Sequence, residues 1–287
     1  MSEVKRNERI VKLKLDIIFK RVFGNPQNED IIKSFLSAML EIPIEKVKVR
    51  NVEIPPENIE KKFCRLDVNL EVDGRAINIE LQINNEGNFI ERTLFYWSKL
   101  YIEPLDAGED YDLLRETICI NIVDFDLFKS PNYHSHFKIM EKQRRETLTD
   151  KFSIHFFELN KIRSFKGGKH DMEEWLHLIN AETEGELMDI EIQTDSKEIK
   201  KTVDILRRLS ADEKVQQEVR LREKILRDET SALNNARREG KEEGRKDERE
   251  KMMKGYINLI KEGKISTEDA AKALNMSVEE FQEETNH

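Results

Sequence analysis

Apolar and polar residues alternate along two adjacent segments, and this pattern predicts a β-hairpin. The apolar positions of the two segments are Leu66, Val68, Leu70 and Val72, then Ile77, Ile79, Leu81 and Ile83. Such alternation is typical of strands with one buried face. Asp73 and Gly74 lie between the two strands. This dipeptide favours a type I′ turn, because both central positions of that turn need a positive φ.

The turn also predicts the register of the hairpin. If Asp73 and Gly74 are the loop, the facing pairs are Val72 with Arg75, Asn69 with Asn78, Asp67 with Glu80, and Arg65 with Gln82. Facing residues have Cβ atoms only about 4.5–5.5 Å apart, so two carboxylates there repel each other. A cation between them removes the repulsion, and hard oxygen ligands suit Mg²⁺, Mn²⁺ or Ca²⁺. The alternative is a solvated polar strand face, which needs no function.

The rest of the first half predicts helices on both sides of a mixed sheet. Helical spacing of apolar residues predicts helices over 15–23, 29–40 and 89–105. Alternating or continuous apolar runs predict strands over 47–54, 118–125 and 152–159. Strands and hairpins between flanking helices indicate an α/β sandwich.

The predicted hairpin carries a short motif that resembles a known superfamily. Asp67 followed by Glu80, Leu81 and Gln82 resembles the core of the PD-(D/E)XK, or restriction-endonuclease-like, superfamily, in the subset where Gln replaces the usual Lys. Segments 15–24, 79–83, 96–101 and 133–135 occur in the order of one family. The chain therefore resembles the recombination-promoting nuclease and transposase family from about residue 13 to residue 161.

The resemblance implies a fold, a reaction and a set of site residues. It implies a restriction-endonuclease-like α/β fold and a metal-dependent DNA endonuclease that hydrolyses phosphodiester bonds, used in recombination, mobile-element biology or defence. Asp67, Glu80 and Gln82 are then the catalytic residues. Asp67, Glu80 and the backbone carbonyl of Leu81 hold Mg²⁺, or Mn²⁺ or Ca²⁺ in its place. Asp16, on the first helix, is a further candidate ligand.

Gln82 departs from the usual motif of the superfamily. A neutral amide can orient water by hydrogen bonding, but it carries no charge to the transition state. Either Lys20, Arg65 or Lys99 substitutes for the missing Lys, or the enzyme is slow, or it uses a second metal. The candidate DNA-binding residues are Lys20, Arg65, Arg92 and Lys99, and further cations expected near the cleft are Lys12, Lys14, Arg21, Lys61 and Lys62.

The charge of the chain keeps a second class of function open. The net charge is −9, but residues 1–170 hold 28 basic and 28 acidic side chains, so the acidic excess belongs to the remainder. A neutral domain binds DNA through a local patch, weakly and with strong salt dependence. Gln82, the neutral domain and the acidic tail all suit the alternative, a catalytically weak or silent nuclease-fold protein that acts as a binding or regulatory module.

Composition shifts divide the chain into four predicted segments. They are a nuclease-like domain over 1–165, a helical extension over 166–235, a charged helical spacer over 236–254 and a small helical C-terminal unit over 255–287. Three capping boxes are expected to open helices in the second half, at Ser210 with Glu213, Ser266 with Asp269, and Ser277 with Glu280.

The C-terminal unit resembles a small helix-turn-helix. Its second helix carries Glu279, Glu280, Glu283 and Glu284, which would repel phosphates in a major groove. The sequence therefore favours protein contact, such as a homodimer formed through these helices. Family precedent also suggests an internally initiated C-terminal fragment as a partner, for which Met252 or Met253 is a suitable start.

The remaining signals favour an ordinary cytoplasmic protein. No apolar run approaches the roughly 18–20 residues needed to cross a bilayer, and the N-terminus lacks the apolar stretch of a signal peptide. Cys64 and Cys119 lie in apolar strand patterns and are expected to be buried thiols. His134 and His136 have the spacing of two zinc ligands, but no second pair completes such a site, so a structural role is expected.

Overall fold

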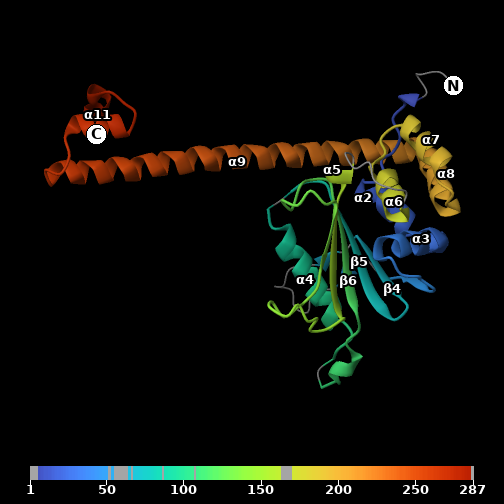
Figure 1. Ribbon diagram of the computed structural model, residues 1–287. Helices are drawn as coiled ribbons and strands as arrows, with labels where there is room; N and C mark the ends of the chain where they lie inside the picture. The colour runs from blue at the N-terminus through green and yellow to red at the C-terminus, as the bar shows by residue number, and fades with distance from the viewer. Residues whose placement is uncertain are drawn as a thin grey trace. The chain divides into compact units, whose positions relative to one another are not determined.

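The computed structural model describes residues 6–50, 53–54, 64–65, 67–85, 87–106, 108–162 and 170–285 (Figure 1). These residues form two compact units, which divide between Glu223 and Lys224. The first unit holds the sheets and most of the helices, and the second holds the later part of one long helix and two short ones. Within the described ranges, no helix is long and apolar enough to cross a membrane.

A six-stranded mixed sheet forms the centre of the first unit. Its order is β1 (Val47–Val49), β4 (Val68–Val72), β5 (Arg75–Gln82), β6 (Thr117–Val123), β8 (Phe152–Glu158) and β7 (His134–Phe137). The central strands β5, β6 and β8 run parallel, and the outer pairs are antiparallel. With helices packed around it, this sheet confirms the predicted α/β class and is consistent with a restriction-endonuclease-like fold.

Strands β4 and β5 form the predicted hairpin in the predicted register. The facing pairs run from Val68 with Ile79 to Val72 with Arg75, and they include Asn69 with Asn78. Asp73 has φ 48° and Gly74 has φ 81°, the two positive angles that a type I′ turn requires. The Asp73 carboxylate also accepts hydrogen bonds from the backbone N–H groups of residues 45 and 46, which fixes the turn.

The chain on either side of the hairpin differs from the prediction in two places. A separate two-stranded sheet pairs β2 (Glu53–Ile54) with β3 (Cys64–Arg65), and in it Arg65 lies opposite Glu53. The single strand predicted over 47–54 is therefore wrong, and so is the predicted position of Arg65 opposite Gln82. The β4–β5 ladder ends at Val68, because the backbone N–H of Asp67 donates to the Glu80 side chain.

Three helices lie on one side of the sheet and contact one another through aromatic side chains. They are α2 (Asp16–Phe23), α3 (Glu29–Leu40) and α6 (Asp171–Asn180), and Figure 1 shows them on the side opposite α4 (Phe89–Ile102). The Trp175 ring lies 6.0 Å from Phe23 and 5.7 Å from Phe35, between ring centroids. Since Trp175 is 1% exposed, helix α6 belongs to the same core as the N-terminal helices.

Helix α4 covers the other face of the sheet. A buried cluster joins the helix to the strands through Phe89, Cys119, Val123, Ile154 and Phe156. Trp97 packs against this cluster, stacks on Tyr101 and donates from Nε1 to the backbone oxygen of Thr117 at 2.8 Å. Cys119 is buried, as predicted, and the side chain of Cys64 lies outside the described residues.

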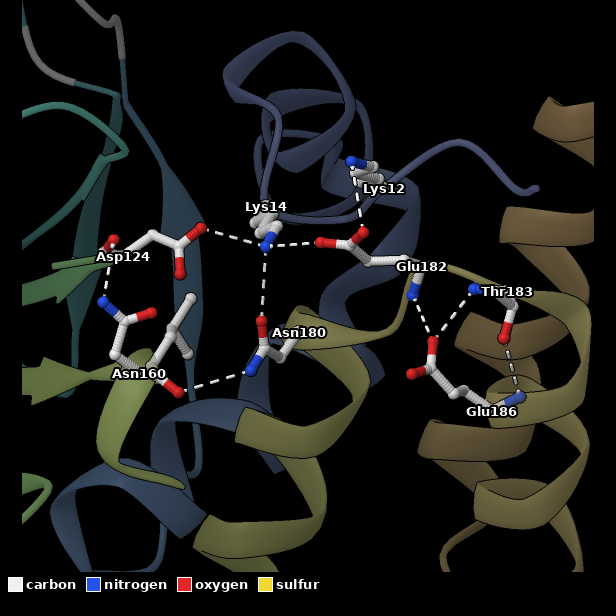
Figure 2. A network of polar contacts seen from close by, with 9 residues as sticks. Lys12, Lys14, Asp124, Asn160, Asn180, Glu182, Thr183 and Glu186 are labelled. Atoms are coloured by element: carbon white, nitrogen blue, oxygen red, sulfur yellow. Dashed lines mark hydrogen bonds and ion pairs between the residues drawn. The ribbon is translucent and has the colours of Figure 1, made fainter. Parts of the chain in front are cut away.

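The N-terminal segment is tied to the second half of the chain around Lys14 (Figure 2). The Lys14 ammonium lies 2.9 Å from Asp124 Oδ2 and 2.8 Å from Glu182 Oε1, and it donates to Asn180 Oδ1 at 3.3 Å. Lys14 is only 5% exposed, so its charge needs these oxygens. The expectation that Lys14 lies at a DNA cleft is therefore wrong. Lys12 pairs with Glu182 as well, at 3.4 Å.

The remaining short elements complete the first unit. They are α5 (Leu159–Ile162), α7 (Glu184–Gln193), α8 (Lys197–Ala211), and the 3-10 helices η1 (Pro26–Asn28) and η2 (Tyr111–Leu113). Arg21 of α2 forms an ion pair with Glu218. The residues Lys61 and Lys62 lie outside the described residues.

One continuous helix, α9 (Glu213–Lys261), follows α8. Asp212 caps its first turn, because Asp212 Oδ1 accepts from the backbone N–H groups of Lys214 and Val215, at 2.9 and 3.2 Å. The predicted capping box at Ser210 is wrong. Ser210 lies in the last turn of α8, where its hydroxyl donates to the backbone oxygen of Leu206 at 2.7 Å.

The second unit ends in two short helices around a small core. Helices α10 (Thr267–Ala273) and α11 (Val278–Thr285) begin at the two capping boxes predicted at Ser266 and Ser277, and both boxes are confirmed. The buried residues of this core are Met253, Ala270, Ala271 and Phe281. Met253 therefore packs inside the unit, whereas its neighbour Met252 is 46% exposed.

Candidate active site

Asp67 and Glu80 come together at the end of the hairpin that is remote from the turn. Asp67 lies directly before β4, and Glu80 is near the end of β5. The backbone N–H of Asp67 donates to Glu80 Oε1 at 3.3 Å, and that of Leu81 donates to Asp67 Oδ2 at 2.9 Å. The hairpin geometry thus holds the two carboxylates side by side.

The environment of Glu80 opposes its ionisation. Glu80 is 7% exposed, and burial together with the neighbouring Asp67 charge raises the pKa of its carboxyl group to about 8. Two hydrogen bonds to Glu80 Oε1, from Asn78 Nδ2 at 2.9 Å and from the backbone N–H of Asp67 at 3.3 Å, lower this pKa, and so does the charge of Arg92. A carboxyl group with this pKa is largely protonated at neutral pH unless a cation approaches it.

Two buried amide oxygens lie on the same pair of strands. Asn69 and Asn78 face each other across the hairpin and are 2% and 0% exposed. Neither Oδ1 atom accepts a hydrogen bond from the described residues. Buried acceptors without a donor are rare and often face water or an ion. In the sequence the pair is visible only as a facing position of the hairpin, although Asn78 lies two residues from Glu80.

Lys20 of helix α2 is the cation that contacts Asp67. Its Nζ lies 3.0 Å from Asp67 Oδ1, and the two side chains are 30% and 17% exposed. A salt bridge that is partly screened by solvent is worth roughly 1 kcal/mol or less. A divalent cation that binds the carboxylates therefore loses only this small free energy when it displaces the Lys20 ammonium.

Asp16 lies one turn before Lys20 on α2, but its carboxylate is engaged elsewhere. Arg222 Nε donates to Asp16 Oδ1 at 2.9 Å and to Oδ2 at 3.1 Å. Arg222 belongs to α9 and is 206 residues away in sequence. No local pattern in the sequence predicts a pair between residues so far apart.

Gln82 lies on the same face of β5 as Glu80 and is bound at both ends of its amide. Its Oε1 accepts a hydrogen bond from Arg92 of α4, and its Nε2 donates to the backbone oxygen of Asn84 at 2.8 Å. Residues two apart in a strand share a face, so the arginine lies on the side of the sheet where Glu80 points.

The structure gives no contact of Lys99 or Arg65 with the two carboxylates among the residues it describes. Lys99 follows Arg92 by seven residues on α4, or about 10 Å along the helix axis. Its Nζ lies 6.0 Å from the ring centroid of Phe95. Arg65 lies in β3 opposite Glu53, and its side chain is outside the described residues.

The donors at this site fit a hard divalent cation. The described residues hold no group of three His, Cys, Asp or Glu side chains arranged for a metal, so a third ligand must come from elsewhere. The backbone oxygen of Gln82 accepts a hydrogen bond from the backbone N–H of Asp124, so it points toward β6. The backbone N–H of Leu81 donates to Asp67 Oδ2, on the opposite edge of β5. Because the N–H and C=O of one strand residue share an edge, the Leu81 carbonyl also faces the Asp67 side. Two carboxylates and a carbonyl are ligands that suit Mg²⁺, Mn²⁺ or Ca²⁺.

A histidine cluster lies at the far edge of the sheet. His134 Nε2 is 3.1 Å from His155 Nδ1, and Ser153 Oγ is 3.0 Å from His155 Nε2 and 2.8 Å from His136 Nε2. The His155 ring stacks on both other imidazoles. Burial lowers the pKa of all three histidines, that of His155 to about 3. Neutral, stacked and hydrogen-bonded imidazoles agree with the expected structural role.

Comparison with known proteins identifies the family of the chain. The searches of curated proteins and of solved structures each found no match. A model of one protein family, described as PD-(D/E)XK nuclease family transposase, matches residues 13–236. This match covers most of the chain and includes Asp67, Glu80 and Gln82, so the resemblance found in the sequence is confirmed. The chain belongs to the PD-(D/E)XK nuclease family of transposases.

Proposed function

We propose that this protein is a divalent-metal-dependent DNA endonuclease that hydrolyses phosphodiester bonds. The observation that carries the proposal is the close pair formed by half-buried Asp67 and buried Glu80 at one end of the hairpin. Two carboxylates that share a site raise the free energy of the folded protein unless a proton or a cation lies between them. Strongly perturbed acids in such a place favour function over a solvated strand face.

In this proposal Asp67, Glu80 and the Leu81 carbonyl would hold the ion, which is expected to be Mg²⁺, with Mn²⁺ or Ca²⁺ as substitutes. A bound ion of this kind lowers the pKa of water and neutralises charge that develops on the phosphate. Glu80 must lose its proton to become a ligand, because only the carboxylate binds metal well. Lys20 leaves Asp67 Oδ1 at the same time and is then free to pair with a DNA phosphate.

Asp16 is left out of the proposed ligand set. Both of its carboxylate oxygens accept from Arg222, so recruiting Asp16 would break an ion pair and leave the guanidinium to solvent. The family acid on the first helix would then support the site through Arg222 and α9 instead of contacting the ion.

Cleavage of supercoiled plasmid at low salt tests this function. Purified protein with Mg²⁺, Mn²⁺ or Ca²⁺ is compared with Asp67→Ala and Glu80→Ala, and with Glu116→Ala as a matched control. Glu116 is a partly exposed carboxylate in an ion pair with Arg75. We expect both site variants to lose cleavage and the control to keep it. Cleavage that survives in both site variants would refute the proposal.

A catalytically silent nuclease fold is the second candidate. The contact that favours it is the Lys20 ammonium on Asp67, which neutralises one of the two acids without any metal. Gln82 also lacks the charge of the usual Lys. In this case the protein binds or regulates a partner and neither cuts DNA nor takes up a divalent ion at Asp67.

The acidic C-terminal unit is proposed to contact protein. Helix α11 has exposed Glu279 and Glu283, and Glu280 accepts at its capping box, so this helix would repel a phosphate backbone. A second copy of the chain is the proposed partner. Sedimentation of the intact protein at several concentrations tests this, and a monomer at every concentration would refute it.

A further inference from the structure

Gln82 occupies the position where a lysine would supply positive charge, and the structure places Arg92 against it. We propose that Arg92 replaces that lysine and contacts the phosphate undergoing hydrolysis, with Gln82 as the positioning residue that holds the guanidinium in place. The proposal rests on the nuclease function proposed above and assigns a further catalytic residue to it.

Several contacts fix Arg92 in this place. Its guanidinium donates to Gln82 Oε1, and its Cζ lies 5.0 Å from the ring centroid of Phe89, a cation–π contact. The amide of Gln82 cannot turn freely, because its Nε2 is bound to the backbone oxygen of Asn84. Arg92 is therefore preorganised by the end of β5 and by the first turns of α4.

The positive charge of Arg92 acts on the carboxyl group of Glu80. It favours the ionised form of Glu80 and so opposes the rise in the pKa of that group. An arginine stays charged at any relevant pH and presents a planar fork that matches a phosphate, whereas a lysine presents a single point charge. The bond to Gln82 Oε1 uses one terminal nitrogen of the guanidinium, and the planar group has the shape that a phosphate contact needs.

The cations considered earlier are placed less well for this role. Lys20 contacts Asp67 itself, where it competes with a metal ion instead of assisting it. Lys99 lies two turns beyond Arg92 on α4, over the Phe95 ring. Arg65 belongs to the small β2–β3 sheet. Within the described residues, Arg92 hydrogen-bonds to Gln82, the motif residue at the position of the usual lysine.

The chemistry requires no proton from Arg92. A water oxygen forms a bond to phosphorus, the bond from phosphorus to one deoxyribose oxygen breaks, and that oxygen leaves with a proton that came from the water. Negative charge accumulates on the non-bridging oxygens during this exchange. Arg92 keeps its protons and donates hydrogen bonds to those oxygens, where fixed donors act most strongly.

Variants at positions 92 and 82 test the assignment. We expect Arg92→Gln to lower the cleavage rate by about 10²-fold to 10³-fold, the range for loss of one preorganised donor. Adding Gln82→Lys to that variant, or using Arg92→Lys alone, should restore a large part of the rate. Arg144→Gln is the matched control, because Arg144 is an exposed arginine paired with Glu146. It should cut like the wild type.

A second readout does not depend on cleavage. In the presence of a chelator, binding of a short DNA duplex is measured over a series of salt concentrations. Each phosphate contact contributes about 0.9 to the steepness of the plot of log affinity against log salt concentration. Loss of one contact in Arg92→Gln should therefore reduce the steepness by about 0.9. Thermal unfolding of each variant shows whether the fold is kept.

The outcomes separate this inference from the function on which it rests. If the wild type cuts DNA and Arg92→Gln cuts at the same rate, or binds with an unchanged salt slope, the role of Arg92 is wrong and the nuclease function stands. If the rate falls and neither lysine variant restores it, Arg92 is only structural and the inference fails. If the wild type neither cuts nor binds DNA, both proposals fall together.

Discussion

The Lys20 ammonium lies 3.0 Å from Asp67 Oδ1, so a side chain of the protein competes for an oxygen that we assign to a metal ion. Removing the ammonium should therefore strengthen metal binding. We predict that Lys20→Gln raises the affinity for Mn²⁺ by a factor of about five, which corresponds to a partly exposed ion pair worth roughly 1 kcal/mol. Calorimetric titration measures this.

The matched control for that variant is Lys33→Gln. Lys33 forms an ion pair with Glu29 on the neighbouring helix α3, with a separation of 2.7 Å and similar exposure of the lysine. It should leave the Mn²⁺ affinity unchanged. If Lys20→Gln binds Mn²⁺ no better than Lys33→Gln does, Lys20 does not compete at the site.

Glu80 makes the stability of the metal-free protein depend on pH. Its pKa is about 8 in the folded protein and near the ordinary value of 4.5 in the unfolded chain, so the folded state binds more protons between these values. Stability is then fully present below about pH 4.5 and falls as the pH rises toward 8, by a few kcal/mol. Chemical denaturation at several pH values, with a chelator present, measures the fall.

The variant Glu80→Gln isolates this effect. It keeps the size of the side chain and removes the ionisable group, so its stability should lack the decline that the wild type shows between pH 5 and pH 8. The same decline in both proteins would mean that other groups cause it and that Glu80 ionises normally.

Asp16 and Arg222 join the first helix to α9. Because their side chains are 26% and 29% exposed, we predict that Asp16→Asn and Arg222→Gln each destabilise the protein by roughly 1 kcal/mol, and that the double variant costs little more than either one. Metal affinity should stay unchanged in Asp16→Asn. A large loss of metal affinity in that variant would return Asp16 to the ligand set.

The packing of Trp175 determines which truncated fragments of the chain should fold. The ring packs on Phe23 and Phe35, so a fragment that ends at residue 165, the proposed limit of the nuclease-like domain, exposes both phenylalanines. We predict that this fragment shows no cooperative unfolding transition and that a fragment of residues 1–235 does. In the intact protein Trp175→Ala should cost about 3–5 kcal/mol. A cooperative transition in the shorter fragment would contradict this prediction.

Local chemistry explains which parts of this structure could be predicted from the sequence. The hairpin follows from the alternation of apolar residues and from the Asp73-Gly74 turn, both of which act within twenty residues. The same register brings Asp67 to Glu80. The helix α3 and the capping boxes at Ser266 and Ser277 are equally local features.

The missed features depend on choices that local patterns cannot decide. Ser210 and Asp212 are both good caps, and the structure uses Asp212 because Ser210 is still inside α8. The backbone N–H of Asp67 donates to the Glu80 side chain instead of to the backbone of β5, so the hairpin pairing stops there. Arg65 pairs with Glu53 in the other sheet. Asp16 and Arg222 lie 206 residues apart in sequence, and packing inside the first unit, to which the beginning of α9 belongs, brings them together.

The most direct test of the account is a calorimetric titration of Mn²⁺ into metal-free protein at pH 7, repeated in two buffers with different ionisation enthalpies. We predict one tight site that releases close to one proton, about the amount expected if Glu80 must ionise to bind. Asp67→Asn and Glu80→Gln should abolish binding, and Glu116→Gln should bind like the wild type. Absence of binding to the wild type, or binding that survives both site variants, would contradict the proposed metal site.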